Sequence, residues 1–481
     1  MVVEMPTECV IHWFRRDLRL HDNLALEAAL RTGAPVVPVF ILDSRVLAQP
    51  TMGERRVQFL RTALTDLDAQ LQEHGGRLLV VHSTDPAREL NRIAEETGAW
   101  ALFFNRDYTP YARWRDTRAT RGMQMTGVVT MPMDDLLLVS PLATAGENDS
   151  FPQAFTPFSR RWFAALELEA EQAPSDGTFM APDELPEGTP GWAEMLSPDL
   201  PEPSTWPGAT SAAADQQLLD FIDGSLAGYA ERRDLPADIE GTSRLSAALK
   251  FGTISVRRVA RAAIAHGARN PGAQPATERF ILELAWRDFA HHLLFHRPEL
   301  LQQPLRTPAW AEAAASARPV GTPRALAAFD AWVEGRTGVP MVDAGMRQLL
   351  SEGWMHNRVR MVVASFLAHQ LGADWRAGER HFARHLVDLD VASNDLGWQW
   401  AVGVGVDAAP YRRTFNPQRQ GEKFDPDGVY VRRYVPELKH VPDRYLHHPW
   451  DMPDEVQATA GCRVGIDYPE PIAPAAMPRR A

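Results

Sequence analysis

The segment VIHWFRRDLRLHDNLAL, residues 10–26, begins with a mostly apolar run and continues through a charged loop into a helical pattern. Three runs of the same kind follow: APVVPVFIL at 34–42, RLLVVH at 77–82 and ALFFN at 101–105. Between them, segments such as RVQFLRTALTDLDAQLQEHG carry apolar residues at helical spacing. Continuous apolar runs are typical of buried parallel strands. Their alternation with amphipathic helices predicts a Rossmann-like, doubly wound parallel-sheet domain over residues 1–133.

The first predicted strand lacks the glycine pattern of a common dinucleotide site. No GxGxxG follows residue 14. In such sites the glycines let the chain approach a pyrophosphate closely. We therefore do not expect the α/β domain to bind a dinucleotide through that fingerprint.

A long acidic connector is predicted over residues 134–207. Its part from 166 to 204 contains ten acidic residues, seven prolines and neither Lys nor Arg. Such a composition favours an extended, exposed segment over a core element. It also accounts for most of the net charge of −12, so basic surfaces elsewhere remain compatible with a nucleic-acid partner.

Composition restricts the remaining classes of protein. A chain of 481 residues is long enough for two or more domains. It has no run of eighteen apolar residues, and its first residues lack the basic start and apolar block of a secretory signal. There are only two cysteines, and the adjacent His291 and His292 point in different directions on a helix. We therefore expect a cytoplasmic protein with no membrane span and no metal site.

Residues 208–481 have a helical pattern, and GTSRLSAALKFG at 241–252 carries the first candidate site within it. Thr242, Ser243 and Ser246 lie at the start of a predicted helix, with Arg244 among them. Hydroxyl and backbone N–H groups at a helix start can bind an anion such as a diphosphate. An ordinary Ser/Thr helix cap explains the same pattern.

Residues 278–298, ERFILELAWRDFAHHLLFHRP, form a predicted amphipathic helix with two notable polar members. Glu283 and Trp286 lie three positions apart and share one face. A carboxylate and an indole directed at one cavity can bind and stack a planar group. The alternative is a buried tryptophan with a glutamate at the rim of the helix.

The stretch WMHNRVRM, residues 354–361, combines an amide with an adaptable apolar side chain. Asn357 and Met361 are four apart and share a helical face. Methionine adapts its shape to a ligand, while the asparagine amide reads hydrogen-bonding edges. Arg360 is expected to form an ion pair with Asp388, which lies in the next motif.

VDLDVASNDLGWQW, residues 387–400, places further polar and aromatic groups together. Asp390 and Asn394 are four apart and share a face. Trp398 and Trp400 are two apart, so on a helix they project about 200° from each other. One can face the interior while the other lines a pocket. Simple packing of the tryptophans in the core is the alternative explanation.

Seven motifs together resemble the photolyase/cryptochrome family. They occur in order between residue 10 and about residue 450: FRRDLRLHDNLAL, GTSRLSAALKFG, ELAWRDF, AWVEGRTGVPMVDAGMRQL, WMHNRVRM, VDLDVASNDLGWQW and GVDAAPYRRTFNPQRQGEKFD. The resemblance implies an α/β domain, a long connector and an all-α carboxyl-terminal domain that holds FAD in a folded conformation. It also implies that the flavin is not bound by the α/β domain.

Within that family the chain is most similar to class I cyclobutane pyrimidine dimer photolyases. Asn357 and Met361 match residues that this class places beside the lesion, where (6-4) photolyases and animal cryptochromes have a histidine pair. Asn394 and Trp400 are photolyase-like, because plant cryptochromes have Asp at the first position and tend to have Tyr at the second. A signalling cryptochrome without repair activity is the main alternative; a flavoprotein that binds nucleic acid without repairing it is another.

The resemblance assigns roles to individual residues. The FAD phosphates and ribityl chain would contact Tyr229, Thr242, Ser243, Arg244, Leu245 and Ser246. The isoalloxazine would be surrounded by Arg360, Asp388, Asp390 and Asn394. The lesion pocket would contain Glu283, Trp286, Asn357, Met361 and Trp400. The DNA would be contacted by Arg287, Arg358 and Arg413.

The implied reaction is light-driven electron transfer to a flipped-out pyrimidine dimer in single- or double-stranded UV-damaged DNA. Asn394 and Glu283 would act beside the reacting groups, and Trp398 and Trp375 would be the first two tryptophans that photoreduce oxidised flavin. Thr322 stands where the class I pattern has the third, and Trp310 is a possible substitute. We therefore expect slower or rerouted photoreduction with intact repair, in a protein that acts as a monomer.

An antenna chromophore is the last expectation. Family members bind methenyltetrahydrofolate or 8-hydroxy-5-deazaflavin in or beside the α/β domain. FFNRDYTPYARWRD, residues 103–116, occupies the relevant region but matches neither antenna type cleanly. A loop without a chromophore is the alternative.

Overall fold

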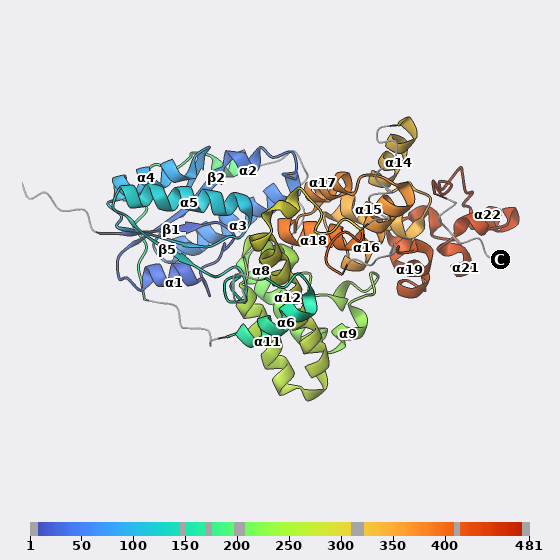
Figure 1. The fold of residues 1–481 in the computed structure, drawn as a ribbon, viewed down its shortest axis with the longest axis horizontal. Coiled ribbons are helices and arrows are strands. Elements are labelled where there is room, and N and C mark those ends of the chain that lie inside the picture. Colours follow the sequence, from blue (N-terminus) through green and yellow to red (C-terminus); the bar gives the residue numbers. More distant parts are fainter. Residues whose placement is uncertain are drawn as a thin grey trace, which may run out of the picture. The chain divides into compact units, whose positions relative to one another are not determined.

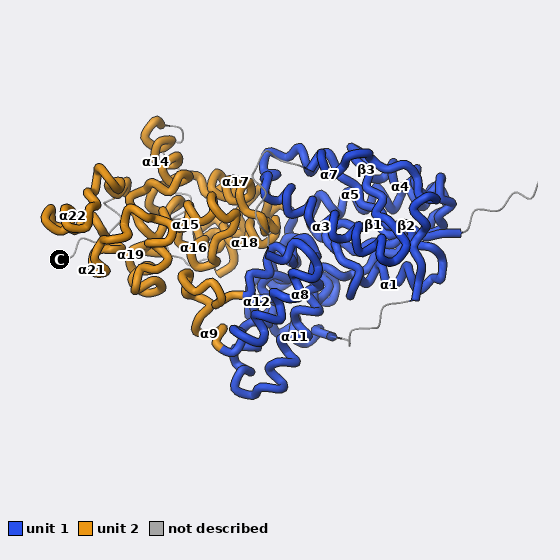
Figure 2. The backbone as a smooth tube through the Cα atoms, turned by 180° about the vertical axis from the view of Figure 1, so that it is seen from behind, with its two compact units in different colours: residues 1–227, 243–298 blue, residues 228–242, 299–481 orange. Residues whose placement is uncertain are grey.

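The computed structural model describes residues 8–144, 151–168, 176–196, 207–308, 322–407 and 414–473 (Figure 1). The chain divides into two compact units, which Figure 2 colours separately. Unit 1 comprises Met1–Ala227 with Ser243–Pro298, and unit 2 comprises Gly228–Thr242 with Glu299–Ala481. The compact units are divided at other residues than the expected domain boundaries, 133 and 207, which stay a prediction.

A five-stranded parallel sheet forms the amino-terminal part of unit 1, as predicted. Its strand order is β3-β2-β1-β4-β5, so β1 pairs with both β2 and β4. The order reverses beside β1, which is the arrangement of a doubly wound fold. The strands are β1 Val10–Phe14, β2 Val36–Asp43, β3 Leu79–Ser83, β4 Ala101–Asn105 and β5 Val129–Met133.

Helices cover both faces of this sheet. In Figure 1, α1 lies on the opposite side of the sheet from α4 and α5. Ile11, Val39 and Leu102 of the strands pack in one buried cluster with Leu90 and Ile93 of α4. The helices are α1 Leu24–Leu30, α2 Ser44–Leu47, α3 Glu54–Glu73, α4 Pro86–Thr97 and α5 Pro110–Met125.

The first part of the expected connector is not an exposed linker. Helix α6, Phe155–Ala165, buries Phe158 and Trp162 completely. The indole Nε1 of Trp162 donates a hydrogen bond to Asp288 at 3.0 Å. Phe155, Phe158 and Trp162 are spaced so that they share one helical face, which explains why this segment packs rather than extends.

Unit 1 also contains the short helix α7, which lies within the expected connector, and four helices that follow the connector. The loop after β1 is hydrogen-bonded to the carboxyl end of α10: Arg16 Nε donates to Lys250 O, and Arg19 Nη1 donates to Gly252 O, each at 3.2 Å. These bonds explain why this helical segment groups with the sheet. The helices are α7 Trp192–Met195, α8 Ser211–Gly224, α10 Ser246–Phe251, α11 Val256–Arg269 and α12 Gln274–His296.

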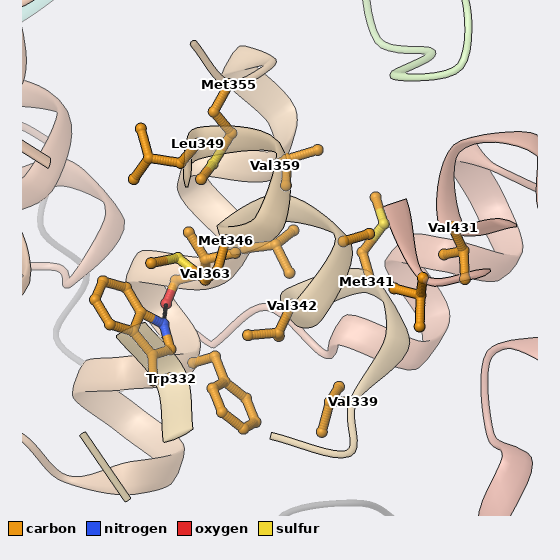
Figure 3. Packing of buried hydrophobic residues seen from close by; sticks show 14 of the residues in the cluster. Trp332, Val339, Met341, Val342, Met346, Leu349, Met355, Val359, Val363 and Val431 are labelled. Atoms are coloured by element: carbon orange, nitrogen blue, oxygen red, sulfur yellow. Dashed lines mark hydrogen bonds between the residues drawn. The ribbon is translucent and has the colours of Figure 1, made fainter. Parts of the chain in front are cut away.

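Unit 2 is helical throughout its described part, as predicted. Its largest buried cluster surrounds Trp332, whose indole Nε1 donates to Val363 O at 3.1 Å (Figure 3). The helices are α9 Tyr229–Arg232, α14 Pro323–Val333, α15 Pro340–Glu352, α16 Asn357–Ser365, α17 Trp375–His385, α18 Val391–Ala401, α19 Pro417–Phe424, α20 Val429–Tyr434, α21 Asp443–Leu446 and α22 Asp454–Ala460. A π-helical segment, Phe366–Leu371, extends α16. Among the residues that the structure describes, no helix is long and apolar enough to cross a bilayer.

Candidate functional site

Unit 2 contains a cavity of about 160 Å³ between α16, α17 and α18. Seven of the residues that the sequence singled out line it: Asn357, Arg360, Met361, Asp388, Asp390, Asn394 and Trp398. The other lining residues are Ala364, Phe382, Leu386, Leu389, Ser393 and Gly397. The cavity therefore combines charged, amide and apolar surfaces in one place.

Helix α16 supplies one wall. His356 caps its start, because its Nδ1 accepts a hydrogen bond from Arg358 N at 3.1 Å. Asn357 and Met361 follow on the same face and both line the cavity, as their spacing predicts. Arg358 is turned to another partner: its Nη2 lies 2.7 Å from Asp234 Oδ2, and its guanidinium lies 4.3 Å from the centre of the Phe424 ring. Its expected contact with DNA phosphate stays a prediction.

The predicted ion pair between Arg360 and Asp388 is present. Arg360 Nη2 lies 2.8 Å from Asp388 Oδ2, and Arg360 Nε donates to Met355 O at 2.8 Å. Asp388 is 6% exposed. Its second oxygen, Oδ1, is buried and has no hydrogen-bond partner among the described residues. A buried carboxylate oxygen without a partner is costly, so this atom is suited to a ligand that donates a hydrogen bond.

Asp390 begins the opposite wall. Its Oδ1 accepts a hydrogen bond from Ser393 N at 3.0 Å, so Asp390 is the N-cap of α18. Asn394 lies one turn further and also lines the cavity. Trp398 is buried and faces the cavity, whereas Trp400 is partly buried and lies near the Phe415 ring at 6.1 Å. The two tryptophans therefore face different surroundings, as their spacing predicts.

These residues fit the isoalloxazine of FAD. The buried Asp388 Oδ1 can accept a hydrogen bond from a ring N–H group, and the buried Trp398 Nε1 is a donor without a partner in the described chain. Arg360 provides a positive charge, and Asn394 provides a neutral amide. Met361, Leu389 and Phe382 supply apolar contacts for a flat ring system. Together they offer a flavin ring system a positive charge, a neutral amide and an apolar surface.

Asp395, the neighbour of Asn394, faces away from this wall. Its carboxylate accepts hydrogen bonds from Gln399 Nε2 at 3.0 and 3.2 Å, and the residue is 3% exposed. Burial, together with the charge of Glu379, raises the pKa of Asp395 to about 7. This carboxyl group is thus held in its neutral form over much of the acidic range.

A pH dependence of stability follows. The folded protein binds a proton at Asp395 more tightly than the unfolded chain does, so its free energy of unfolding should fall as pH rises from about 4 to about 7. The loss should be on the order of 1–3 kcal/mol. Urea unfolding of wild type and Asp395→Asn at pH 5 and pH 8 measures it: the difference in free energy of unfolding between the two pH values should be smaller in the variant by about this amount. An equal pH dependence in both proteins would contradict the assignment.

The second group of expected FAD residues lies at 229–246. Tyr229 is 6% exposed, and the Arg233 guanidinium lies 5.4 Å from the centre of its ring. Gln217 Nε2 donates to Ser243 O at 2.8 Å, which fixes the chain before α10. Arg244 has a left-handed backbone, with φ of 51°, and Leu245 follows with φ of −77° and ψ of 2°. This alternation turns successive N–H groups to one side, a geometry that binds anions.

Helix α12 carries the expected lesion residues of unit 1. Trp286 stacks on Phe155 of α6, with ring centres 3.6 Å apart and planes 5° from parallel. Glu283 forms an ion pair with Arg279 at 3.0 Å. Arg287 Nη1 donates to Leu136 O at 2.9 Å. The bond anchors the connector, and the DNA contact expected of Arg287 stays a prediction.

The expected order of electron carriers, Trp398 followed by Trp375, stays a prediction. In the described chain, Trp398 makes ring contacts with Phe382 at 5.0 Å and with Trp332 at 6.3 Å. Trp375 begins α17, with the Arg376 guanidinium 4.3 Å from its ring centre. Thr322 is the N-cap of α14. Trp310 and Arg413 lie outside the described residues.

Sequence reasoning missed several residues that complete these surfaces. Gly397, Ser393 and Leu389 line the cavity within one turn of predicted residues, so their spacing was a usable signal. Trp332 and Phe155 belong to helices distant in sequence from their partners Trp398 and Trp286. Spacing along one helix carries no information about such contacts.

The predicted antenna region contains an exposed aromatic residue on α5. Trp114 is 44% exposed. The Arg45 and Arg118 guanidinium groups lie 5.1 and 5.3 Å from its ring centre, and Tyr111 lies 5.7 Å from it. The cluster offers aromatic and cationic surface for a flat, anionic molecule.

Comparisons with known proteins cover almost the whole chain. Residues 10–176 match the family model for DNA photolyase, and residues 280–481 match the model for the FAD binding domain of DNA photolyase. A deoxyribodipyrimidine photo-lyase from Agrobacterium fabrum is 40% identical, over 98% of this chain and 96% of the relative. The expected fold and the expected FAD cofactor are confirmed.

Two solved structures are also similar along their full length. A bacterial class III photolyase from Agrobacterium tumefaciens has a TM-score of 0.86 at 39% identity, covering 98% of this chain and 96% of that one. A cryptochrome from Synechocystis has the same TM-score at 27% identity, covering 98% and 97%. Because a class III photolyase is among the similar structures, the expected class I assignment stays a prediction.

Proposed function

The chain belongs to the DNA photolyase family, and we propose that it uses light to split cyclobutane pyrimidine dimers in UV-damaged DNA. The enzyme class is that of the deoxyribodipyrimidine photo-lyase from Agrobacterium fabrum, which aligns along nearly the full chain. The observation that carries the proposal is the cavity of unit 2, in which Asn357 and Met361 lie with the Arg360–Asp388 pair and Asn394.

FAD, when bound and reduced, would supply the electron that opens the cyclobutane ring after illumination. The protein's own groups would bind and orient the flavin and the lesion, and they would exclude water from both. Arg360 counters negative charge on the ring system, Asp388 holds Arg360 and offers Oδ1 to a ring N–H group, and Asn394 presents an uncharged amide. An amide at this position adds no negative charge beside a reduced flavin, which a carboxylate would.

Aromatic and polar side chains would recognise the lesion. Trp286 and Trp400 would stack on the flipped-out pyrimidines, and Asn357 with Met361 would contact their edges and faces. Glu283, when protonated, would donate a hydrogen bond to a dimer carbonyl. Basic side chains, Arg358 and Arg413 among them, would contact the DNA phosphates and make binding salt-dependent.

Illumination of the purified, reduced protein with dimer-containing DNA tests the function. The substrate is a synthetic oligonucleotide with a single thymine dimer, and restoration of two thymines is followed by chromatography in light and in darkness. We expect repair only in light. An equivalent oligonucleotide with a (6-4) photoproduct should remain unrepaired, and its repair would overturn the choice of lesion.

A blue-light photoreceptor without repair activity is the second candidate, because a cryptochrome aligns with 98% of the chain. The amide of Asn394 in the cavity favours repair over this alternative. The same illumination experiment separates the two. A protein that binds FAD and responds to light but leaves dimers intact would be a cryptochrome.

Photoreduction of oxidised flavin is expected to depend on Trp332 as well as Trp398. The Trp332 ring lies 6.3 Å from that of Trp398, so it offers a second path beside Trp375. Single Trp332→Phe and Trp375→Phe variants should each photoreduce more slowly, and the double variant should be slowest. Transient absorption measures the rates, and Trp398→Phe should nearly abolish the reaction. Wild-type rates in Trp332→Phe would exclude the second path, while repair by chemically reduced protein should survive in both single variants.

We also propose that the Trp114 cluster of α5 binds an antenna chromophore, either methenyltetrahydrofolate or 8-hydroxy-5-deazaflavin. The two arginines beside the ring suit an anionic chromophore. The absorption spectrum of the protein as isolated distinguishes the two molecules. A Trp114→Ala variant should lose that absorption while keeping FAD.

A further inference from the structure

Gly397 occupies a position where a helix ordinarily avoids glycine. It lies inside α18, Val391–Ala401, and lines the cavity of unit 2. In a helix interior, glycine is less favourable than alanine because it loses more backbone freedom on folding. Glycine at this position must therefore be explained by the groups that surround it.

Neither packing within the described chain nor backbone conformation requires a glycine at this position. A Cβ added to Gly397 would have no heavy atom of the described chain within 4 Å, apart from its own helix backbone and chain neighbours. Its φ lies outside the left-handed region that favours glycine. Gly378 on the facing helix α17 shows the contrast, because a Cβ there would collide with the Trp398 ring and with Leu367. Gly378 is required by internal packing, and Gly397 is not.

The open space at Gly397 belongs to the side of α18 that holds the polar residues of the cavity. Asn394 lies three positions before it and Trp398 directly after it, and both line the same cavity. The buried donor Trp398 Nε1 is without a partner in the described part of the chain. The glycine thus leaves bare helix backbone between an amide and an indole, where a flat ring can lie in direct contact with the chain.

We propose that Gly397 is the position at which the isoalloxazine of FAD lies against the backbone of α18. The inference rests on the proposed function, since it names FAD as the ligand of this cavity. A side chain at 397 fills space that the ring requires. Alanine there should therefore have opposite effects on the two states of the protein.

The variant Gly397→Ala tests the proposal. Without flavin, the variant should melt a few degrees above wild type, because alanine favours the helix and meets no clash. With flavin, its dissociation constant for FAD should rise by about tenfold or more, as overpacking of a fitted contact does. Differential scanning fluorimetry of flavin-free protein and titration with FAD measure the two quantities.

Gly224 provides a matched control. It is the last residue of α8 in unit 1, and a Cβ added there also meets nothing within 4 Å. Gly224→Ala should leave the affinity for FAD at the wild-type value. A larger change, Gly397→Leu, should give a protein that circular dichroism shows to be folded but that purifies without flavin.

Two results would overturn the inference. One is an unchanged dissociation constant for FAD in Gly397→Ala; the other is a fall in the melting temperature of its flavin-free form, which would indicate an internal packing role. Either result leaves the proposed function intact if wild type binds FAD and repairs dimers. Failure of wild type to bind FAD would instead remove the proposed function and the inference together.

Discussion

Replacing Asp388 with asparagine should remove most of the bound FAD. The change keeps the shape of the side chain but takes away its charge, so the bond from Arg360 Nη2, now 2.8 Å, loses its ionic character. It also places an amide where, in the proposed function, the buried Oδ1 would accept a hydrogen bond from the flavin. Hydrogen bonds to charged groups contribute about 1.5–3 kcal/mol, so the affinity for FAD should fall roughly ten- to a hundredfold.

The measurement compares flavin content and FAD dissociation constants of wild type and Asp388→Asn. Glu437→Gln is the matched control, because Glu437 also pairs with an arginine, Arg347, at 2.8 Å in the same unit but lines no part of the cavity. It should lose a similar ionic bond and keep its flavin. Equal loss of FAD in both variants would mean that Asp388 acts on stability alone. Retention of FAD by Asp388→Asn would exclude its carboxylate from the site.

Four strands of the sheet were predictable, and the edge strand β5 was not. β1, β2, β3 and β4 contain the four apolar runs that the sequence displays, because strands covered on both faces need no polar alternation. β5, VTMPM, is an edge strand that pairs only with β4, and Pro132 interrupts it. An edge strand tolerates proline and exposed side chains, so its sequence lacks the signature of a buried strand.

Composition misled the prediction for the connector. The acidic, proline-rich stretch starts at 166, but the expected connector began at 134 and so included α6. The apolar face of α6 was legible as Phe155, Phe158 and Trp162 at helical spacing. The composition of a long window does not reveal such a short amphipathic helix, because the helix contributes only a small part of the residues.

In the site, contacts along one helix were predictable and most contacts between helices were not. Helical spacing correctly predicted that Asn357 and Met361 of α16 line one surface, and that Asp390 and Asn394 at the start of α18 do so as well. The Arg360–Asp388 pair was found because opposite charges in neighbouring motifs attract. The partner of Arg358, Asp234, is more than a hundred residues away, and no local pattern points to it.

The Trp286→Ala variant should lose affinity for dimer-containing DNA while keeping its FAD. Phe155 already covers one face of the indole, in parallel contact at 3.6 Å, so the opposite face is the one available to a pyrimidine. Stacking of a base on an aromatic side chain contributes about 1–3 kcal/mol, which corresponds to roughly a five- to 150-fold loss of affinity. Fluorescence anisotropy in the dark, with dimer-containing and undamaged oligonucleotides, measures the loss.

The contact with Phe155 makes a second, graded variant informative. Phe155→Leu keeps an apolar group beneath Trp286 but removes the parallel ring that orients it, so affinity should fall by less than in Trp286→Ala. Trp114→Ala, which removes a 44% exposed tryptophan of the same unit, should leave dark binding unchanged. If Trp286→Ala binds the dimer as wild type does, the indole belongs to the packing of α6 on α12. If Phe155→Leu alone has the full effect, orientation of the indole, and not merely its presence, determines recognition of the lesion.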